Sequence, residues 1–267
     1  MPLYCGIGGV KHKISGMYTG VGGVRKDLPE IWTAENGVKK RIYRARIEIG
    51  LLPVGTIVRL KENGELVEYI LVHQGLPSVK YDLSCNGSWI LRKDLLINHP
   101  YAEGAKQPYF ASSLALEWLN SQMYNWFDPS TREKILPVKI PYRADGDPPT
   151  TKTGAEGLQC RIFFLSAPEV GYDYAHHGDG TRLAYFESGN TPSANAKRAA
   201  QVNGKNEDYY TRSPDYRNEP IGYILYVSDS GYFGDTNSTS PEDSAYYGFR
   251  PAMIIQPDSE VSPDGIL

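Results

Sequence analysis

The stretch SDSGYFGDTNSTSPEDSAYYGFRPAM (residues 228–253) joins two different kinds of sequence. Residues 228–247 are mostly Ser, Asp, Gly, Asn, Thr and Tyr, a composition that predicts a loop rich in turns. The segment FRPAMII (249–255) that follows is mostly apolar and predicts a buried strand. We therefore expect a long polar loop that is held at its base by a strand of the core.

Short strands are predicted upstream of this loop. TIVRL (56–60) and ELVEYILVH (65–73) flank Asn63-Gly64, a pair that suits the type I′ turn of a β-hairpin. Further strands are expected at ILPVKI (135–140), QCRIFFL (159–165) and YILYVS (223–228).

Three helices are predicted. Ser113 can cap a helix that runs through Trp126, because one face at helical spacing is apolar and comprises Leu114, Trp118, Leu119, Met123 and Trp126. The two tryptophans are interpreted as core residues rather than as a platform for a ligand. Asp128-Pro129 predicts a second short helix, and the capping-box spacing of Ser166 and Glu169 predicts a third. The chain is thus expected to be α+β, with few helices and long loops.

The N-terminus repeats every fourteen residues, as YCGIGGVKHKISGM, YTGVGGVRKDLPEI and WTAENGVKKRIYRA. A Gly-Gly or Asn-Gly pair stands at the same place in each repeat, which predicts a meander of three short strands with tight turns. Such a small β-hairpin module should dock on its own domain, on copies of itself or on a larger assembly. We expect this attachment module over residues 1–47 and a second domain over residues 48–267.

The composition is that of an ordinary globular protein, with a formal net charge of −3 over 267 residues. No run approaches the roughly 18 apolar residues of a membrane-spanning helix, and the opening MPLYCGIGGVKHK lacks the apolar core of a signal peptide. We expect a soluble protein that is made in a cytosol and does not insert into a membrane. The first 46 residues are basic, but no aromatic stacking pattern accompanies their charges, so nucleic-acid binding is not expected.

No residue pattern indicates catalysis, a metal site or a cofactor. The chain has no G-x-S-x-G elbow, Walker loop or H-E-x-x-H motif. His176-His177 and Asp179 lack a third well-spaced ligand, so they are interpreted as a solvated loop. Cys5, Cys85 and Cys160 have no C-x-x-C spacing, and we expect buried thiols rather than disulfides or a zinc site.

Tyrosine is the strongest positive signal for function. Eight of the twenty tyrosines fall between residues 209 and 247, namely Tyr209, Tyr210, Tyr216, Tyr223, Tyr226, Tyr232, Tyr246 and Tyr247. Together with Ser, Gly, Asn and Asp they give the composition of an antibody paratope, in which rigid aromatic rings supply contact area. The loop is interpreted as a binding surface. The alternative is a polar loop whose tyrosines fold inward.

Several strings, taken in order, resemble one known family. They are VHQGLPSVKYDLSCNGSWILRKD (72–94), YFASSLALEWLNSQMYNWFD (109–128), VKIPYR (138–143), GLQCRIFFLSAPEVGY (157–172), YYTRSP (209–214) and GFRPAM (248–253). Over roughly residues 50–256 the chain resembles the domain of unknown function 6273 family, which is common in gut bacteria and their phages. The resemblance implies a C-type-lectin-like fold, similar to that of the tip proteins that diversity-generating retroelements mutate. The N-terminal repeats look like those that open phage tail and virion structural proteins.

In such proteins a compact scaffold presents variable side chains near the C-terminus. The resemblance places the ligand-binding surface between Arg212-Ser213-Pro214 and Arg250-Pro251, and it assigns the two arginines to the scaffold. Tyr209-Tyr210-Thr211 departs from the Trp-Trp-Leu of the family pattern at one corner of this scaffold. The ligand-binding candidates are Tyr216, Arg217, Asn218, Glu219, Tyr223, Asp229, Tyr232, Phe233, Asp235, Asn237, Tyr246 and Tyr247.

The resemblance implies a receptor-binding protein of a phage or prophage tail tip rather than an enzyme. The expected partners are a bacterial cell-surface protein or glycan at the C-terminal loops and other virion proteins at the N-terminal repeats. We expect a homo-oligomer, for which a trimer would suit the role, assembled in the bacterial cytoplasm and carried at the tail tip of the virion. Two alternatives stay open: a bacterial surface adhesion or interaction protein that uses the same domain, and an enzyme that acts on glycans.

Overall fold

The computed structural model describes most of the chain after the repeats. Main chain and side chains are described for residues 46–97, 99–102, 109–145, 150–172, 178–215, 222–233 and 247–267. Only the backbone is described for residues 4–7, 10–13, 18–21, 24–27, 30–35, 38–44 and 238–239.

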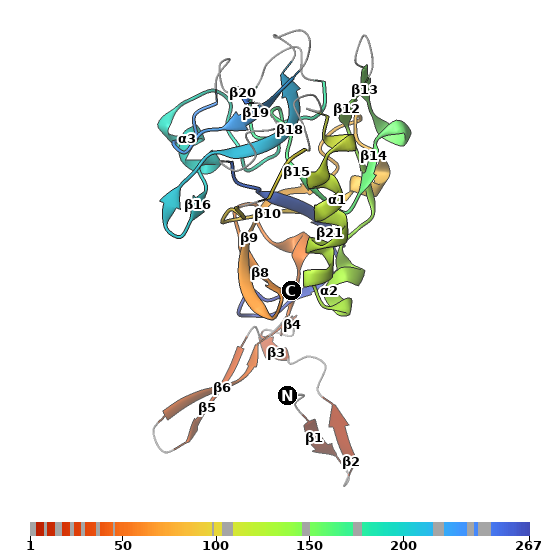
Figure 1. Ribbon diagram of the computed structural model, residues 1–267. Coiled ribbons are helices and arrows are strands. Elements are labelled where there is room, and N and C mark those ends of the chain that lie inside the picture. The colour runs from red at the N-terminus through yellow and green to blue at the C-terminus, as the bar shows by residue number, and fades with distance from the viewer. Residues whose placement is uncertain are drawn as a thin grey trace.

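Strands dominate the described part of the chain after the repeats (Figure 1). They are β7 (Ile47–Glu48), β8 (Ile57–Glu62), β9 (Glu65–Gly75), β10 (Gly87–Arg92), β11 (Val138–Ile140), β12 (Tyr142–Ala144), β13 (Thr150–Lys152), β14 (Leu158–Cys160), β15 (Ile162–Phe164), β16 (Gln201–Val202), β17 (Lys205–Asn206), β18 (Tyr209–Asp215), β19 (Tyr223–Val227), β20 (Ser238–Thr239), β21 (Pro251–Ile255) and β22 (Glu260–Val261).

The α-helices in the described residues are α1 (Leu114–Ser121), α2 (Pro129–Lys134) and α3 (Pro192–Arg198). Short 3-10 turns are η1 (Ile49–Leu51), η2 (Leu83–Cys85), η3 (Phe110–Ser112), η4 (Met123–Trp126) and η5 (Gly154–Glu156). The predicted α+β class is confirmed. Within this described part, none of the helices has the length and apolar character needed to cross a bilayer.

A five-stranded antiparallel sheet carries the core, with the strand order β15-β21-β10-β9-β8. Every residue of β10 and of β21 is buried, because these strands lie inside the sheet and are covered on both faces. Trp89 of β10 is fully buried and meets the rings of Tyr81 and Phe163 edge to face. The predicted hairpin turn between β8 and β9 is confirmed: Asn63 and Gly64 have φ angles of 48° and 90°, as a type I′ turn requires.

Both edges of this sheet are covered in part. At the β15 edge, the amide of Asn120 accepts hydrogen bonds from the N–H groups of Arg161 (2.7 Å) and Ile162 (3.1 Å) and donates one to the Ile162 carbonyl (2.8 Å). At the β8 edge, the N–H of Arg59 donates to the Gly265 carbonyl, and the Leu267 N–H donates to the Arg59 carbonyl. These bonds occupy the outward-facing backbone groups of Ile162 and Arg59, so each edge is partly shielded from pairing with another chain.

The first two helices begin where they are predicted to begin. The Ser113 hydroxyl accepts the N–H of Leu116, and the Asp128 carboxylate accepts the N–H of Thr131. The predicted core role of Trp118 agrees with its packing, since it is partly buried against the core and its ring meets another tryptophan edge to face at 5.2 Å.

The end of the first helix differs from the prediction. α1 stops at Ser121 and a 3-10 turn follows it to Trp126. The Ser121 hydroxyl donates to the Glu117 carbonyl, and the Asn125 amide donates to the Ser121 carbonyl. Such bonds from side chains to the backbone compete with regular helix geometry, which explains the early end.

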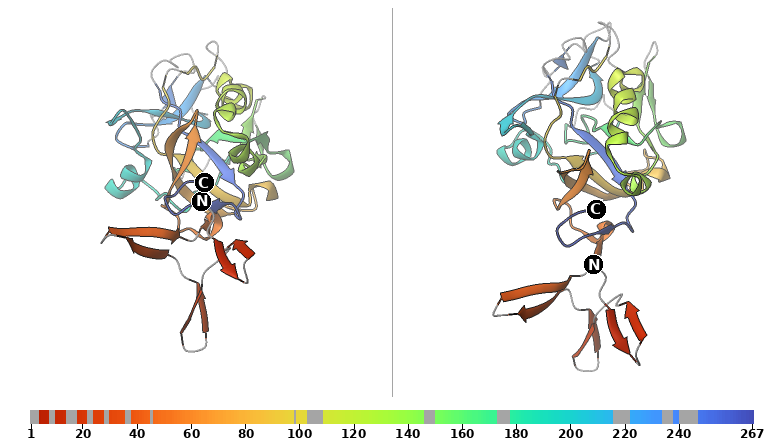
Figure 2. Two further views of the ribbon diagram at one scale, coloured as in Figure 1. Left: turned by 90° about the horizontal axis from the view of Figure 1, so that it is seen from below. Right: turned by 60° about the horizontal axis from the view of Figure 1, so that its bottom comes forward.

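The prediction of a meander for the N-terminal repeats is wrong. The repeats form three separate hairpins (Figure 2). Each fourteen-residue repeat supplies two strands, which flank its Gly-Gly or Asn-Gly pair. The pairs are β1 (Tyr4–Ile7) with β2 (Val10–Lys13), β3 (Tyr18–Val21) with β4 (Val24–Asp27), and β5 (Glu30–Glu35) with β6 (Val38–Arg44). The repeats join the rest of the protein at β7, which pairs with β22.

The edge-covering role of Asn120 generates a prediction. Asn120→Ala should lower the free energy of unfolding by about 1–3 kcal/mol, because partly buried backbone groups at the β15 edge lose their partner. Urea unfolding followed by circular dichroism would measure this change. Asn125→Ala is the matched control, since Asn125 is exposed and the change should stay within about 0.5 kcal/mol. Equal effects of the two substitutions would contradict the role of Asn120.

Candidate ligand-binding surface

The predicted binding surface belongs to a three-stranded sheet, β18-β19-β20, and to residues 228–233, which follow β19. Figure 1 shows this sheet at the end of the molecule that lies far from the C-terminus and from the strands of the repeats. All seven residues of β18 are buried, whereas the first residue of β19 is exposed. The two strands of the sheet whose side chains are described are thus mostly buried, and Tyr223 is their exposed residue.

The structure places five of the twelve candidate residues. Tyr223 and Tyr232 are 42% and 45% exposed, Asp229 is exposed, and Tyr247 is half-buried. Phe233 is only 2% exposed, so the expectation that it lies on the surface is wrong. The other candidates lie outside the described residues; they are Tyr216, Arg217, Asn218, Glu219, Asp235, Asn237 and Tyr246.

Phe233 is buried because its backbone and its ring are both held. The Asn190 amide donates to the Phe233 carbonyl (2.8 Å) and accepts the Phe233 N–H (3.0 Å). The ring then packs on Tyr172 with the centroids 4.4 Å apart. These partners lie 43 and 61 positions away in the sequence, so no local pattern could have revealed them.

The late tyrosines divide between core and surface. Tyr209 and Tyr210 are both buried in β18. The rings of Tyr210, Tyr247 and Tyr226 follow one another, with centroids 5.1 and 4.8 Å apart. Burial, together with the neighbouring Tyr247, raises the pKa of Tyr226 to about 12. The alternative of inward-facing rings therefore holds for Tyr209 and Tyr210, and the interpretation as exposed rings holds for Tyr223 and Tyr232.

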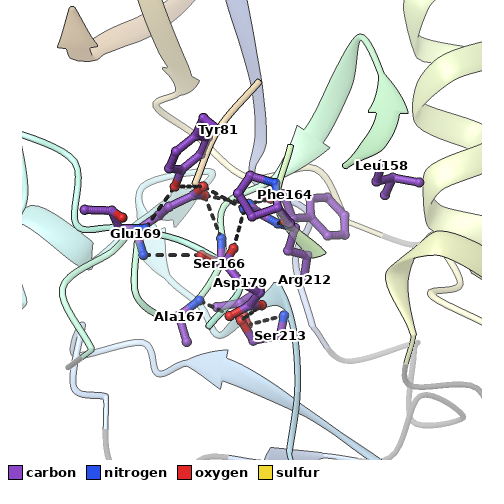
Figure 3. A network of polar contacts seen from close by, with 12 residues as sticks. Tyr81, Leu158, Phe164, Ser166, Ala167, Glu169, Asp179, Arg212 and Ser213 are labelled. Atoms are coloured by element: carbon purple, nitrogen blue, oxygen red, sulfur yellow. Dashed lines mark hydrogen bonds and ion pairs between the residues drawn. The ribbon is translucent and has the colours of Figure 1, made fainter. Parts of the chain in front are cut away.

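A buried ion pair anchors β18 (Figure 3). The two terminal nitrogens of Arg212 bond the two carboxylate oxygens of Glu169 at 2.5 and 2.6 Å, and both side chains are fully buried. The remaining N–H groups of the guanidinium donate to the carbonyls of Pro141, Phe164 and Asp179, so all five donors are occupied. Burial alone would lower the pKa of Arg212, but the charge and hydrogen bonds of Glu169 outweigh it and raise the pKa.

The helix predicted to begin at Ser166 is wrong, because Glu169 lies in a turn. The reciprocal bonds of a capping box are present: Ser166 N–H donates to the Glu169 carboxylate (2.9 Å), and Glu169 N–H donates to the Ser166 hydroxyl (3.4 Å). The carboxylate also accepts the hydroxyl of Tyr81 at 2.7 Å. Gly171, at φ 91°, then turns the chain into a left-handed conformation that a right-handed helix cannot continue.

Asp179 is buried, which contradicts its interpretation as part of a solvated loop. Its carboxylate accepts the Ser213 hydroxyl at 2.6 Å, and its carbonyl accepts Arg212. His176 and His177 lie outside the described residues. Where the structure is described, no group of three or more His, Cys, Asp or Glu side chains could hold a metal ion.

Arg250 links the core sheet to β18, the strand that Arg212 anchors. We call this set of buried, hydrogen-bonded arginines the frame. Its guanidinium donates to the carbonyls of Arg92 (3.1 Å) and Arg198 (2.8 Å) and lies over the ring of Tyr209 at 5.2 Å. The Tyr209 hydroxyl donates to the same Arg198 carbonyl at 2.8 Å. Both arginines that the resemblance assigns to the scaffold, Arg212 and Arg250, are thus buried and bonded inside the protein.

Arg198 is a further residue of the frame that the sequence analysis missed. It ends α3, is fully buried, and donates to the Gly231 carbonyl at 2.8 Å and to the Asn190 side-chain oxygen at 3.0 Å. These bonds hold residues 228–233, which carry Asp229 and Tyr232, against α3. A lone arginine at the end of a short helix gives no sequence signal for such a role.

The described cysteines are buried thiols, as predicted. Cys85 and Cys160 are not joined in a disulfide. Burial raises the pKa of the Cys85 thiol to about 12 and raises that of Cys160 as well, so neither is a thiolate near neutral pH. The side chain of Cys5 lies outside the described residues.

An open groove of about 740 Å³ runs beside α1 and is lined in part by Asn120, Tyr124 and Arg161. Asn120 is bonded to the β15 edge. Arg161 donates to the Ile135 carbonyl at 2.6 Å and lies over the Tyr124 ring at 5.4 Å. The polar side chains most suited to a ligand therefore already serve the fold, and we assign no ligand to this groove.

Comparison with known families gives one match, over residues 86–257, described as Domain of unknown function (DUF6273). The chain belongs to this family. The DUF6273 match begins at residue 86, later than the start near residue 50 that the string resemblance predicts. It includes Arg198, Arg212 and Arg250, so the buried frame below the candidate surface lies inside the DUF6273 region. No curated protein and no solved structure matches the chain.

The buried ion pair gives the first prediction for this surface. Glu169→Gln should lower the free energy of unfolding by about 3–5 kcal/mol, because it leaves Arg212 as an uncompensated buried charge. Chemical denaturation would measure this loss. Glu207→Gln is the control, since it removes an ion pair of similar length (2.7 Å to Lys205) at the surface and should leave the unfolding midpoint nearly unchanged. A midpoint for Glu169→Gln that matches the control would refute the anchoring role.

The close approach of residues 228–233 to α3 gives the second prediction. Gly231 has φ 73°, and a Cβ there would lie 1.9 Å from the Asn195 carbonyl oxygen. Gly204 has a similar φ of 79° with no atom within 4 Å of its Cβ position. Gly204→Ala should therefore cost only the backbone term of about 1–2 kcal/mol, and Gly231→Ala should cost clearly more. Thermal unfolding of the two variants side by side decides this, and equal losses would count against the close contact.

Proposed function

We propose that the protein is a receptor-binding protein of a phage or prophage tail tip, which attaches the particle to a bacterial surface without catalysis. The observation that carries this proposal is the exposure of Tyr223, Asp229 and Tyr232 above a frame of fully bonded, buried arginines. Rigid exposed tyrosines offer contact area at a low cost in side-chain entropy.

The frame supports this role because it limits the movement of the surface. β18 is held by Arg212, and residues 228–233 are held by Arg198 and Asn190. A preorganised surface loses less conformational entropy when it binds a partner than a flexible one does. The C-type-lectin-like fold remains part of the proposal, as does variation of residues 215–247 between related proteins.

The arrangement of the chain also supports the role. The repeats enter the protein at β7, which pairs with β22, whereas β18, β19 and β20 lie at the far end (Figure 1). One end is thus available for attachment to other virion proteins, and the other for a bacterial protein or glycan. Several copies, for example in a homotrimer, would raise the avidity by roughly 10²–10⁴ over a single site.

The exposed tyrosines provide the test. Tyr223→Ala combined with Tyr232→Ala should reduce adhesion of the full chain to gut bacterial cells at least about tenfold, because aromatic anchors dominate such interfaces. The melting temperature should fall by only a few degrees, since Tyr223 and Tyr232 are 42% and 45% exposed and neither belongs to the buried core. Flow cytometry of the fluorescently labelled protein on a panel of strains would measure adhesion.

Val79→Ala combined with Leu83→Ala is the matched control, because these side chains are 96% and 79% exposed and lie outside the surface. This control variant should adhere like the native protein. Unchanged adhesion of the tyrosine variant would refute the proposed surface. Release of sugars from the cell surface by the native protein would refute the non-catalytic role.

A further inference from the structure

The three N-terminal hairpins place the same types of residue on one face. Residues that stand opposite each other in an antiparallel pair share a face of the sheet, and the face alternates along each strand. In the first hairpin, Tyr4 is opposite Lys13 and Gly6 is opposite Lys11. The equivalent pairs are Tyr18 with Asp27 and Gly20 with Arg25 in the second hairpin, and Trp32 with Arg41 and Ala34 with Lys39 in the third. This face, which we call the aromatic face, thus carries one aromatic and one small residue in every hairpin.

Most bases of the hairpins lie on the aromatic face. Residues 10–13, 24–27 and 38–41 contain seven Lys and Arg residues, and the register places five of them on this face and two, Lys26 and Lys40, on the other. The five are Lys11, Lys13, Arg25, Lys39 and Arg41. In the sequence, each of these bases stands seven or nine positions after its aromatic residue, so only the hairpin brings them onto one face. Sequence reasoning therefore finds the charge without the aromatic pattern.

The hairpins need a partner, and their charge restricts what it can be. Within the described residues, each hairpin is a separate two-stranded sheet, and a single hairpin is only marginally stable in water. The hairpins β1-β2 and β5-β6 extend away from the rest of the protein, residues 47–267, which we call the body (Figure 1 and Figure 2). Residues 1–46 contain nine Lys or Arg and three Asp or Glu. Hairpins of different copies would therefore repel one another, and the surface that covers them should be acidic.

The body has an open groove of about 400 Å³ beside the point where the repeats enter it. Its apolar lining residues are Ile47, Leu52, Ile57, Val261 and Pro263. Ile47 is 48% exposed, so apolar surface at this edge is open to solvent. Arg59 also lines the groove, but its guanidinium already donates to the Asp264 carbonyl (2.9 Å) and to the Glu68 carboxylate (2.8 Å). A groove of this size and character can hold an aromatic side chain.

Exposed carboxylates surround the groove. Residues 251–267 contain Asp258, Glu260 and Asp264 and no Lys or Arg, and all three acidic residues are exposed. Asp264 lines the groove, and Glu260 stands directly opposite Glu48 in the β7-β22 ladder. Like charges in opposite positions of a sheet are unfavourable, so additional cations would stabilise this ladder. Arg46, the first residue after the third repeat, bonds Glu260 at 3.3 Å and shows that a base can reach this edge.

We propose that this groove receives the aromatic face of a hairpin from a second copy of the chain. The apolar lining would hold the aromatic residue, and the surrounding carboxylates would meet the bases that share its face. In a closed assembly each copy gives one hairpin and receives one, so the contact is made as many times as there are copies. The inference deepens the proposed function, on which it rests for the need to gather several copies. The candidate surface at the far end of the body stays free.

Self-association of the full chain provides the first test. Sedimentation velocity at low salt should show an oligomer with a Kd on the order of micromolar, because the contact is repeated within a closed assembly. Raising the NaCl concentration from about 50 to about 500 mM should raise the Kd at least about tenfold, since charges at a surface are screened by salt. A chain that stays monomeric at low salt up to about 100 µM would overturn the proposal.

Matched variants test the face. Arg25→Gln combined with Lys39→Gln removes two bases of the aromatic face and should weaken self-association at least about tenfold. Lys26→Gln combined with Lys40→Gln is the control, because it removes the same charge from the same two hairpins on the opposite face. The control should change the Kd less than about twofold. Equal effects of the two variants would indicate general charge attraction and would overturn the assignment to the aromatic face.

Mixing two weakened variants tests whether the contact joins different copies. Asp258→Asn combined with Glu260→Gln alters only the groove side, and its melting temperature should stay nearly unchanged because the lost ion pair is exposed. A mixture with the Arg25→Gln, Lys39→Gln variant pairs an intact hairpin with an intact groove. The second contact, changed on both sides, should lose little more than one changed on one side. The mixture should therefore associate more tightly than either variant alone, and an absence of this gain would refute the exchange.

Other occupants of the groove give distinct results. A monomer in which hydrogen exchange shows protected amides at the groove and in a hairpin would assign the groove to a hairpin of the same copy. Displacement of the second copy by single-stranded oligo(dT) at equal concentration would assign the aromatic face to nucleic acid, which binds through bases and aromatic rings. Either result would overturn the proposal.

The outcome can be separated from that of the proposed function. If the chain is monomeric while adhesion to cells depends on Tyr223 and Tyr232, this inference fails and the proposed function stands. If copies exchange hairpins while no strain is bound, the inference stands and the tail-tip role fails.

Discussion

The bidentate pair between Arg212 and Glu169 is the interaction on which the upper half of the molecule depends. It joins β18 to the turn after β15, and the remaining donors of Arg212 reach carbonyls from three further places in the chain. Neither ion touches solvent, so loss of one partner would leave the other as an uncompensated buried charge. All seven residues of β18, the strand that carries Arg212, are buried.

Around this pair, the frame is built from arginines that bind carbonyl groups. Arg198, Arg212 and Arg250 each collect oxygens from segments that are far apart in the sequence, and together they replace regular secondary structure in a loop-rich region. The DUF6273 match contains all three, yet it leaves out β8 and β9, which are two of the five strands in the core sheet. Residues 46–85 are therefore structurally part of the same body as the family region.

Features that depend on neighbouring residues could be predicted from the sequence, and features that depend on distant contacts could not. The turn at Asn63-Gly64 and the caps at Ser113 and Asp128 follow from local backbone chemistry. The capping-box pair of Ser166 and Glu169 forms, but a helix does not, because the backbone turns into the left-handed region at Gly171, where it passes close to the Glu187 carbonyl 16 positions later. The burial of Phe233 likewise depends on Asn190, a distant residue that no spacing rule connects to it.

The pairing of β7 with β22 has a mechanical consequence. The short ladder is extended by bonds from the N–H groups of Ile49 and Gly50 to the carbonyls of Ser259 and Pro257. The same stretch of chain leads back through β21 to Arg250, which holds the base of β18. A pull applied to the hairpins would load residues 47–62, which continue the chain into β8, and through the β7–β22 hydrogen bonds also residues 250–261, which lead into β21. Tension would be carried by the central sheet, and the exposed tyrosines would stay outside the load path.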